Sequence, residues 1–466
     1  MITFIISLVI LLAGYLVYGR LAERVFRPDE RPTPAVEHPD GVDYVPMKTW
    51  RVFLVQLLNI AGTGPIFGAL MGAVFGPVVF LWIVFGSILG GAVHDYMSGM
   101  ISVRMNGASV SEIVGKYLGK AAKQIMRVFS VILLILVGAV FTTSPAALLA
   151  RLTPDWANTY FWVAVILAYY FLATLLPIDK LIGKLYPVFG GVLILMAAGI
   201  MIGLASGGYH IPELRLANLH PDGKPVFPYL FITVACGAIS GFHATQSPMM
   251  ARCIKSEKHG RRVFYGAMIA ESVIALVWAA AGAAFYGATG GLRNALAELG
   301  QSGVVYDISV SLLGIAGGAM AIIGVVVCPV SSGDTAFRSA RLTIADWFKI
   351  DQSKLLKRVA VTVPLLMIGA VLTQLNFDVV WRYFSWSNQT LAMIALWAAA
   401  MYLARNAKNK WYSLMCALPA AFMSAVSCTY ILMADEGFQI TSAVAYPIGL
   451  CFAAACFALY IVKCAR

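Results

Sequence analysis

The chain has 466 residues, of which 60% are hydrophobic and 12% charged, and its mean hydropathy is +0.81. Soluble domains carry about 25% charged residues, so this composition excludes a soluble domain and indicates a polytopic membrane protein. The net charge of +12 does not indicate a nucleic-acid partner, because the basic residues stand in short loops between apolar segments. The eight cysteines show no metal-ligand spacing and mostly lie in apolar runs, where cysteine behaves as a small hydrophobic residue.

Apolar segments of about 20 residues, the length that crosses a bilayer, recur along the whole chain. The N-terminal segment has no basic residue ahead of its apolar run and no small-residue cleavage site, which is typical of a span rather than a signal peptide. We predict about thirteen spans. They lie at about 2–18, 50–74, 78–103, 124–150, 158–176, 181–205, 226–250, 262–289, 304–330, 358–376, 379–403, 411–433 and 440–463.

The distribution of basic residues supports this count. With the N-terminus placed outside, nearly all of the 34 Lys and Arg residues fall in inner loops. A missed span would invert every later loop, so we expect an extracytoplasmic N-terminus and a cytoplasmic C-terminus. The basic residues that fall on the outer side are Arg151, Arg215, Lys224, Arg293 and Arg382.

Two of the predicted spans contain residues that interrupt helices. In Gln56–Gly72, Pro65 lacks an amide donor, and Gly62 and Gly64 leave the backbone free to depart from helical dihedral angles. A second interruption is predicted in Cys236–Met249. Freed backbone groups at membrane depth are tolerated where they face protein or a watery cavity, and paired discontinuous helices indicate a transporter's binding site.

Each interruption opens a set of about five spans, and because five is odd the second set runs in the opposite sense. The sequence therefore predicts an all-α protein with an inverted five-plus-five core, as in many secondary transporters. The regions are an N-terminal helix and inner loop (1–49), the first repeat (50–205), an outer loop (206–225), the second repeat (226–404) and two final helices (405–466).

Ionisable residues inside spans are costly and are therefore candidates for function. His94 and Asp95 lie on a polar face of the second core span, and Glu271 lies about two turns into its span. We interpret them as candidate proton or ion carriers, the alternative for His94 and Asp95 being hydrogen bonding between helices. His243, in the second break, could couple transport to protons or satisfy a local carbonyl, and half-helix N-termini there favour a carboxylate.

Ser331, Ser332 and Asp334 lie at the inner end of the eighth core span, where oxygen ligands suit a hard cation such as sodium. Alternatively, Ser332 or Asp334 caps the amphipathic helix that follows at 335–348. A zinc site built from His94, Asp95, His243 and Asp334 is a further alternative, although these residues form no spacing motif. We expect no bound metal and no cofactor beyond a coupling proton or sodium ion.

Long stretches of the chain resemble the carbon starvation protein A family, of the peptide transporter group. The likeness is carried by NIAGTGPIFG (Asn59–Gly68), LGGAVHDYMSGMISVRMNGAS (Leu89–Ser109) and PVSSGDTAFRSARLTIAD (Pro329–Asp346), with support from Gly237–Cys253. The resemblance implies an inner-membrane permease for peptides or pyruvate, made when carbon is scarce. It also implies kinship with the LeuT-like amino acid–polyamine–organocation transporters. Longer relatives carry additional C-terminal membrane segments.

In that kin group the broken first and sixth core helices hold substrate, and the first and eighth hold a coupling cation. The resemblance therefore implies that Ser331 and Ser332 lie near a cation and that residues at both breaks touch substrate. Gln246 lies in the second break and Asn388 in the tenth core span, and we add both as candidates because of these positions. The candidate substrate contacts are Asn59, Gly62, Thr63, Gly64, Ser240, Gly241, His243, Gln246 and Asn388.

The leading hypothesis is a secondary active transporter that imports pyruvate or a short peptide with a proton or sodium ion. We expect no enzymatic activity, and we expect the substrate and the lipid bilayer as the only partners. The sequence contains no GxxxxGK[ST] motif, which disfavours direct coupling to ATP. The alternatives are a metal-dependent membrane enzyme or nutrient sensor that uses the His/Asp set, and a receptor that binds substrate without moving it. An ion channel is disfavoured because no filter repeat or acidic ring is present in the sequence.

Overall fold

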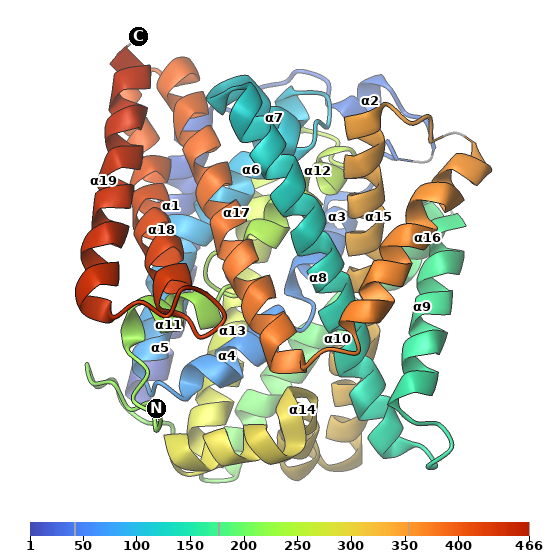
Figure 1. The fold of residues 1–466 in the computed structure, drawn as a ribbon, viewed down its shortest axis with the longest axis vertical. Helices are drawn as coiled ribbons and strands as arrows, with labels where there is room; N and C mark the ends of the chain where they lie inside the picture. The colour runs from blue at the N-terminus through green and yellow to red at the C-terminus, as the bar shows by residue number, and fades with distance from the viewer. Residues whose placement is uncertain (42, 176–177, 353, 466) are drawn as a thin grey trace.

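The structure is a computed structural model, and all regular secondary structure in the residues that it describes is helical (Figure 1). Residues 176 and 177, the end of the predicted span 158–176 and the start of the loop after it, lie outside the described residues. The structure describes residues 1–41, 43–175, 178–352 and 354–465, the side chains of 175–186 and 465 excepted.

Short 3₁₀ and π-helical turns, labelled η, join several of the α-helices. In chain order the elements are α1 (Ile2–Phe26), α2 (Pro34–Glu37), α3 (Thr49–Ala61), α4 (Gly64–Ala73), α5 (Val78–Leu81), η1 (Trp82–Gly91), α6 (Ala92–Arg104), α7 (Val110–Leu118), α8 (Lys120–Leu152), α9 (Thr159–Leu175), α10 (Ile178–Ser206), α11 (Val226–Thr233), α12 (Gly241–Ala251), η2 (Glu257–His259), η3 (Arg261–Tyr265), α13 (Gly266–Phe285), α14 (Thr289–Ile322), η4 (Ile323–Val327), α15 (Cys328–Phe348), α16 (Leu355–Leu372), α17 (Phe377–Asn406), η5 (Lys410–Ser413), α18 (Leu414–Met433) and α19 (Ser442–Ala465).

Nine helical stretches among the described residues are long and apolar enough to cross a membrane, and the bent pair α3–α4 makes a tenth. Three predicted spans fall outside that set. One is α9, which has only 17 residues; the second is divided between α11 and α12; the third is α17, which carries many polar side chains in its 30 residues. An all-helical polytopic membrane protein is therefore confirmed, and the total of about thirteen spans stays a prediction.

The outer helices carry large apolar side chains on their exposed faces. Val17 on α1 is 72% exposed, Leu195 on α10 is 64% exposed and Leu450 on α19 is 68% exposed. Apolar side chains in such numbers would be unstable in water but are stable against lipid. The pattern agrees with a bundle whose perimeter faces hydrocarbon.

The two termini lie at opposite ends of the bundle (Figure 1). The start of α14 crosses the end that holds the N-terminus, whereas α7 and α2 lie at the other end. In the interior, α8 packs along α15 and α17, α4 packs on α13, and α12 packs on α6 and α3. This packing buries the broken helices α3–α4 and α11–α12 at the centre of the bundle.

Candidate functional site

The first predicted break is confirmed between α3 and α4. The helix axis bends by 47° between Ala61 and Gly64. Gly62 adopts φ 45° and ψ −137°, which an L side chain would strain, and a Cβ there would lie 2.8 Å from the Phe141 ring. Pro65 is the second residue of α4, a position where its missing amide hydrogen costs no helical bond.

The second predicted break is confirmed between Thr233 at the end of α11 and Gly241 at the start of α12. Asn388 on α17 holds it open, because its Oδ1 accepts hydrogen bonds from the Phe242 amide at 2.6 Å and the Ser240 hydroxyl at 3.2 Å. The side-chain carbonyl oxygen of Asn388 thus takes the place of the backbone carbonyl that the Phe242 amide would bond in a continuous helix. Substrate contact by Asn388 stays a prediction, since its carbonyl oxygen is already engaged.

The two breaks lie directly against each other. A Cβ on Gly64 would stand 2.4 Å from Cys236 Sγ, and one on Gly237 would stand 3.6 Å from the Pro65 side chain. Gly68 on α4 approaches the Thr233 carbonyl oxygen in the same way, at 3.1 Å. The interrupted segments of two helices therefore share one buried region, with glycine required where they touch.

A chain of ionisable side chains runs beside this region. The carboxylate of Asp95 on α6 lies between two imidazoles, with His94 Nδ1 at 2.8 Å and His243 Nδ1 at 2.9 Å. The other ring nitrogen of His243, Nε2, lies 3.5 Å from Glu271 Oε2 on α13. All four residues are at most 1% exposed. The structure is compatible with both interpretations of His94 and Asp95. Asp95 bonds to another helix, and the pair is also part of a buried chain of groups that can accept a proton.

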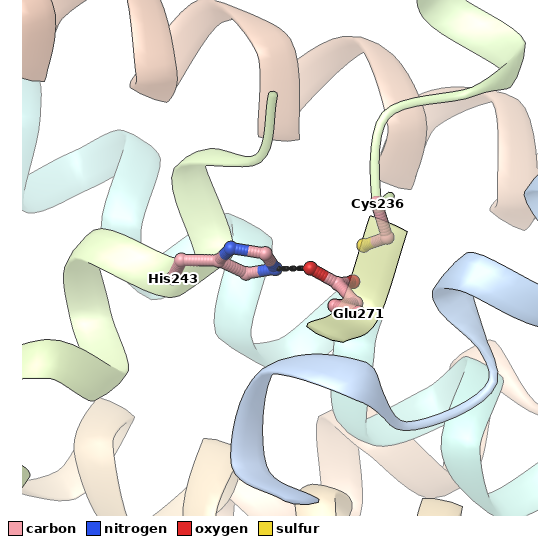
Figure 2. Close-up of side chains that lie close together, drawn as sticks. All are labelled: Cys236, His243 and Glu271. Carbon is pink, nitrogen blue, oxygen red and sulfur yellow. Dashed lines mark ion pairs between the residues drawn. The ribbon is translucent and has the colours of Figure 1, made fainter. Parts of the chain in front are cut away.

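Cys236, His243 and Glu271 converge from three directions onto one point (Figure 2). One ligand-type atom from each lies within 4.8 Å of the others, and this is the only such group in the described part of the chain. Of the predicted alternative set, only His243 belongs to this group. His94 and Asp95 lie outside it, and so does Asp334, which lies 3.9 Å from Arg338 on its own helix. Cys236 was not predicted, since a cysteine in an apolar run carries no distinguishing signal.

Several polar side chains at the breaks each have at least one polar atom that makes no hydrogen bond to any described residue. Asn59 and Thr63 are fully buried, and both side-chain polar atoms of Asn59 and the Thr63 hydroxyl are without partners. Gln56 and Gln246 are also fully buried, and the Oε1 atom of each is unpartnered. Leaving such a group unpaired costs about 1–3 kcal/mol, so this cluster has the character of a site completed by a bound polar molecule.

The inner end of the eighth core span is built differently from the prediction. α15 runs without interruption from Cys328 to Phe348, so Ser332 and Asp334 lie inside the helix and the capping interpretation was wrong. Ser331 donates to the carbonyl of Cys328 in its own helix. Ser332 donates to the Leu58 carbonyl of α3 at 3.1 Å, and it therefore satisfies backbone that the first break has freed.

The remaining predicted substrate contact, Gly241, packs against α17. A Cβ on Gly241 would lie 2.3 Å from the Asn388 carbonyl oxygen, so its role in the described structure is close helix packing. Gln56 was not predicted as a site residue although it begins the first break. The available signal was a lone amide side chain within an apolar segment, which is expensive unless it has a partner.

A family model described as carbon starvation protein CstA matches residues 1–160 and 156–288, more than half of the chain. The chain belongs to the carbon starvation protein CstA family. A Haemophilus influenzae relative, described only as an uncharacterized membrane protein, is 42% identical over 349 residues, covering 64% of this chain and 94% of that protein.

Two further relatives carry functional names. The peptide transporter CstA of Campylobacter jejuni is 30% identical over 344 residues, which cover 58% of this chain and 48% of that protein. The pyruvate/proton symporter BtsT of Escherichia coli is 29% identical over 341 residues, which cover 58% of this chain and 47% of that protein. The aligned part spans about half the length of these two relatives. The CstA family is thus one of transporters and not of enzymes.

Solved structures give the fold. A point mutant of the Eremococcus coleocola manganese transporter matches with a TM-score of 0.59 and 13% identity, covering 92% of this chain and 99% of that one. MhsT in complex with L-phenylalanine matches with a TM-score of 0.57 and 16% identity, covering 89% and 98%. Both are LeuT-fold transporters, and at these identities the likeness shows the fold alone.

Proposed function

We propose that this CstA-family protein is a proton-coupled symporter that imports a small carboxylate such as pyruvate, or a short peptide. The observation that carries the proposal is the juxtaposition of two broken helices with a buried His–Asp–His–Glu chain. Discontinuous helices at the bundle centre provide the substrate site, and the chain provides groups that hold and pass a proton. The names of the C. jejuni and E. coli relatives agree with both parts.

The substrate site lies at the contact of the two breaks. The unpartnered Asn59 amide and Thr63 hydroxyl supply donors and acceptors there, and the unpartnered Oε1 of Gln246 supplies an acceptor. A carboxylate is the ligand group that such donors, together with the free amides at the start of a half-helix, bind best. Gly62 and Ser240 contribute backbone and hydroxyl groups at the two edges of the same region.

The coupling ion in this proposal is the proton. His243 lies between Asp95 and Glu271, so a proton can move between the imidazole Nε2 and the Glu271 carboxylate without leaving the buried interior. The sodium alternative relied on Ser331, Ser332 and Asp334, and the Asp334 carboxylate lies 3.9 Å from the Arg338 guanidinium. The hydroxyls of Ser331 and Ser332 donate to the carbonyls of Cys328 and Leu58, so in this structure they bond to backbone.

The same proposal includes the topology. We infer about thirteen spans in a bacterial inner membrane, with the inverted repeats at 50–205 and 226–404, an outer loop at 206–225, and flanking segments at 1–49 and 405–466. The support is that every predicted span overlaps a helix or a broken pair, and that the termini lie at opposite ends of the bundle.

Uptake into liposomes tests the function. Purified full-length protein is reconstituted, and labelled pyruvate or Ala-Ala dipeptide is supplied with a pH gradient, acid outside, or with a sodium gradient. We expect the pH gradient alone to drive accumulation of one of the two compounds, and a protonophore to abolish it. Sodium-driven accumulation would contradict the coupling. Binding without gradient-driven uptake or counterflow would identify a receptor instead.

A further inference from the structure

A cavity of about 210 Å³ is lined in part by the start of α14, which lies at the end of the bundle that holds the N-terminus (Figure 1). Its wall is built from α4 and the two residues after it, α11, α14, α17, Tyr430 of α18 and the end of the loop before α11. A neighbouring cavity of about 260 Å³ shares Leu296 and Asp378 with it. We call the two together the outer cavity; each is large enough for a small carboxylate.

The basic residues of the outer cavity are the exceptions in the charge pattern. Lys224, Arg293 and Arg382 line the first part and Arg151 lines the second. These are four of the few basic residues that the positive-inside pattern places outside. The carboxylates that line the outer cavity are Asp222 and Asp378, so four cations face two anions. In the proposed topology, four of the outer-side cations therefore line one cavity.

Lys224 is the available cation in the first part of the outer cavity, and Arg151, in the second part, is likewise in no ion pair with a described carboxylate. Arg293 is engaged by Asp222 at 2.9 Å, and Arg382 by Glu436 at 3.1 Å. The Lys224 ammonium lies within ion-pair distance of no described carboxylate; it stands 5.7 Å from the centre of the Tyr229 ring.

Two further polar groups in the wall have no partner among the described residues. The indole Nε1 of Trp381 and the hydroxyl of Ser385 make no hydrogen bond, although these residues are only 5% and 2% exposed. Both residues line the outer cavity. Buried donors left unpaired beside a free ammonium are the pattern expected for an anion-binding site.

The floor of the outer cavity leads toward the central site. Trp381 contacts Phe67 of α4, with ring centres 5.9 Å apart, and Phe384, with ring centres 5.3 Å apart. Phe384 in turn contacts Phe141, whose ring packs against Phe242 beside the second break. An aromatic layer therefore separates the outer cavity from the buried polar cluster, so that a ligand in the cavity is one layer away from it.

We propose that the outer cavity is a second carboxylate-binding site, in which Lys224 holds the substrate before the aromatic layer opens. This rests on the proposed function for the substrate class. The Trp381 indole and the Ser385 hydroxyl donate to the same carboxylate, and the Arg293–Asp222 and Arg382–Glu436 pairs set the size of the mouth. Lys224 is a binding residue here and takes no part in proton transfer.

Uptake kinetics of the reconstituted full chain give the first test. Lys224→Gln should raise the KM for labelled pyruvate or Ala-Ala about fivefold at low salt with kcat unchanged, the loss expected for one solvent-screened charge pair. The difference should vanish at about 1 M salt, where the screening length is about 3 Å. Lys224→Arg should restore the KM. The control is Lys255→Gln, an exposed lysine outside the outer cavity. A KM of Lys224→Gln equal to that of this control would overturn the proposal.

Equilibrium dialysis of labelled pyruvate in detergent separates this proposal from the transport function. The full chain should bind pyruvate at two sites, Lys224→Gln should lose one of them, and Asn59→Ala should lose the other. If pyruvate binds and Lys224→Gln weakens that binding while no uptake occurs, the outer site stands and the transport proposal fails. Absence of pyruvate binding, or equal binding by Lys224→Gln and the wild type, would overturn the outer site.

Discussion

At the scale of single residues, His243 is the side chain on which the coupling depends. Its ring is fixed on one side by Asp95 and approached on the other by Glu271, so each ring nitrogen faces a carboxylate on a different helix. The histidine itself comes from the second broken helix. Movement of α12 during transport would therefore change the path of a proton and the substrate site together.

We predict that His243→Gln lowers pH-gradient-driven accumulation at least about tenfold, because glutamine cannot accept and release the proton. Substrate counterflow, which needs no net proton movement, should fall far less. Both are measured in the same liposomes. His38→Gln, an exposed histidine, is the control and should behave as the wild type. Unchanged accumulation by His243→Gln would remove this residue from the coupling path.

At the scale of elements, the contact between the two breaks depends on the absence of a side chain at Gly64. The Cα of this residue lies against Cys236, and the next turn of α4 lies against the Thr233 carbonyl. Glycines that permit such contact are common where membrane helices pack closely. The alternation of glycine and proline thus serves two purposes, since it interrupts α3–α4 and also lets α11–α12 approach.

Gly64→Ala should push the two breaks apart, because the new Cβ would stand 2.4 Å from Cys236 Sγ. Overpacking of this kind costs about 1–3 kcal/mol, and we expect a lower melting temperature in detergent and loss of uptake. Gly191→Ala is the matched control, since a Cβ there meets nothing within 4 Å on α10. If both variants melt and transport alike, the contact between the breaks is not required.

A second inter-element contact ties several helices together at the end opposite the N-terminus. Glu257 of η2 is 1% exposed, and its carboxylate accepts from Arg104 of α6 at 3.0 and 2.9 Å and from the Asp29 amide at 3.1 Å. Arg104 also donates to the Tyr402 hydroxyl of α17 at 2.9 Å. One buried carboxylate therefore joins the ends of α1, α6 and α17.

Glu257→Gln should destabilise the protein by about 3 kcal/mol, since it leaves the Arg104 guanidinium without a charged partner. Thermal unfolding in detergent measures the loss. The control is Glu30→Gln, whose carboxylate pairs with Lys258 on the exposed surface and whose loss should cost under about 1 kcal/mol. Equal melting temperatures for the two variants would show that the buried contact contributes little.

At the scale of the whole molecule, charge and fold agree on one orientation. The loop that holds Lys224 lies at the end with the N-terminus, and the loop that holds Lys255 follows α12 and belongs to the predicted inner side. The outer cavity therefore faces the periplasmic side in the proposed topology, where substrate arrives.

Cysteine labelling tests this orientation. An impermeant maleimide should label Pro221→Cys in intact cells, because residue 221 is exposed in the loop before α11. It should label Lys255→Cys only after the membrane is permeabilised. The unsubstituted chain, with its eight cysteines, gives the background. The reverse labelling pattern would invert the topology and place the outer cavity in the cytoplasm.

The sequence by itself determined the membrane class, the positions of most helices and both interruptions. These are local properties: apolar length follows from composition, and a proline or an adjacent glycine changes the backbone wherever the chain folds. The family likeness was also readable, because it rests on contiguous motifs. The same local reasoning failed at Ser332 and Asp334, where residues typical of a cap lie inside a continuous helix.

Only the tertiary structure decided which side chains meet. His243 and Asp95 are 148 positions apart, and their contact depends on the rotation of α12 against α6. Cys236 joined His243 and Glu271 for the same reason, while Asp334 was turned toward Arg338 instead. A break is set by the backbone of a few residues, but a site between breaks is set by how whole helices pack, and no local pattern encodes that rotation.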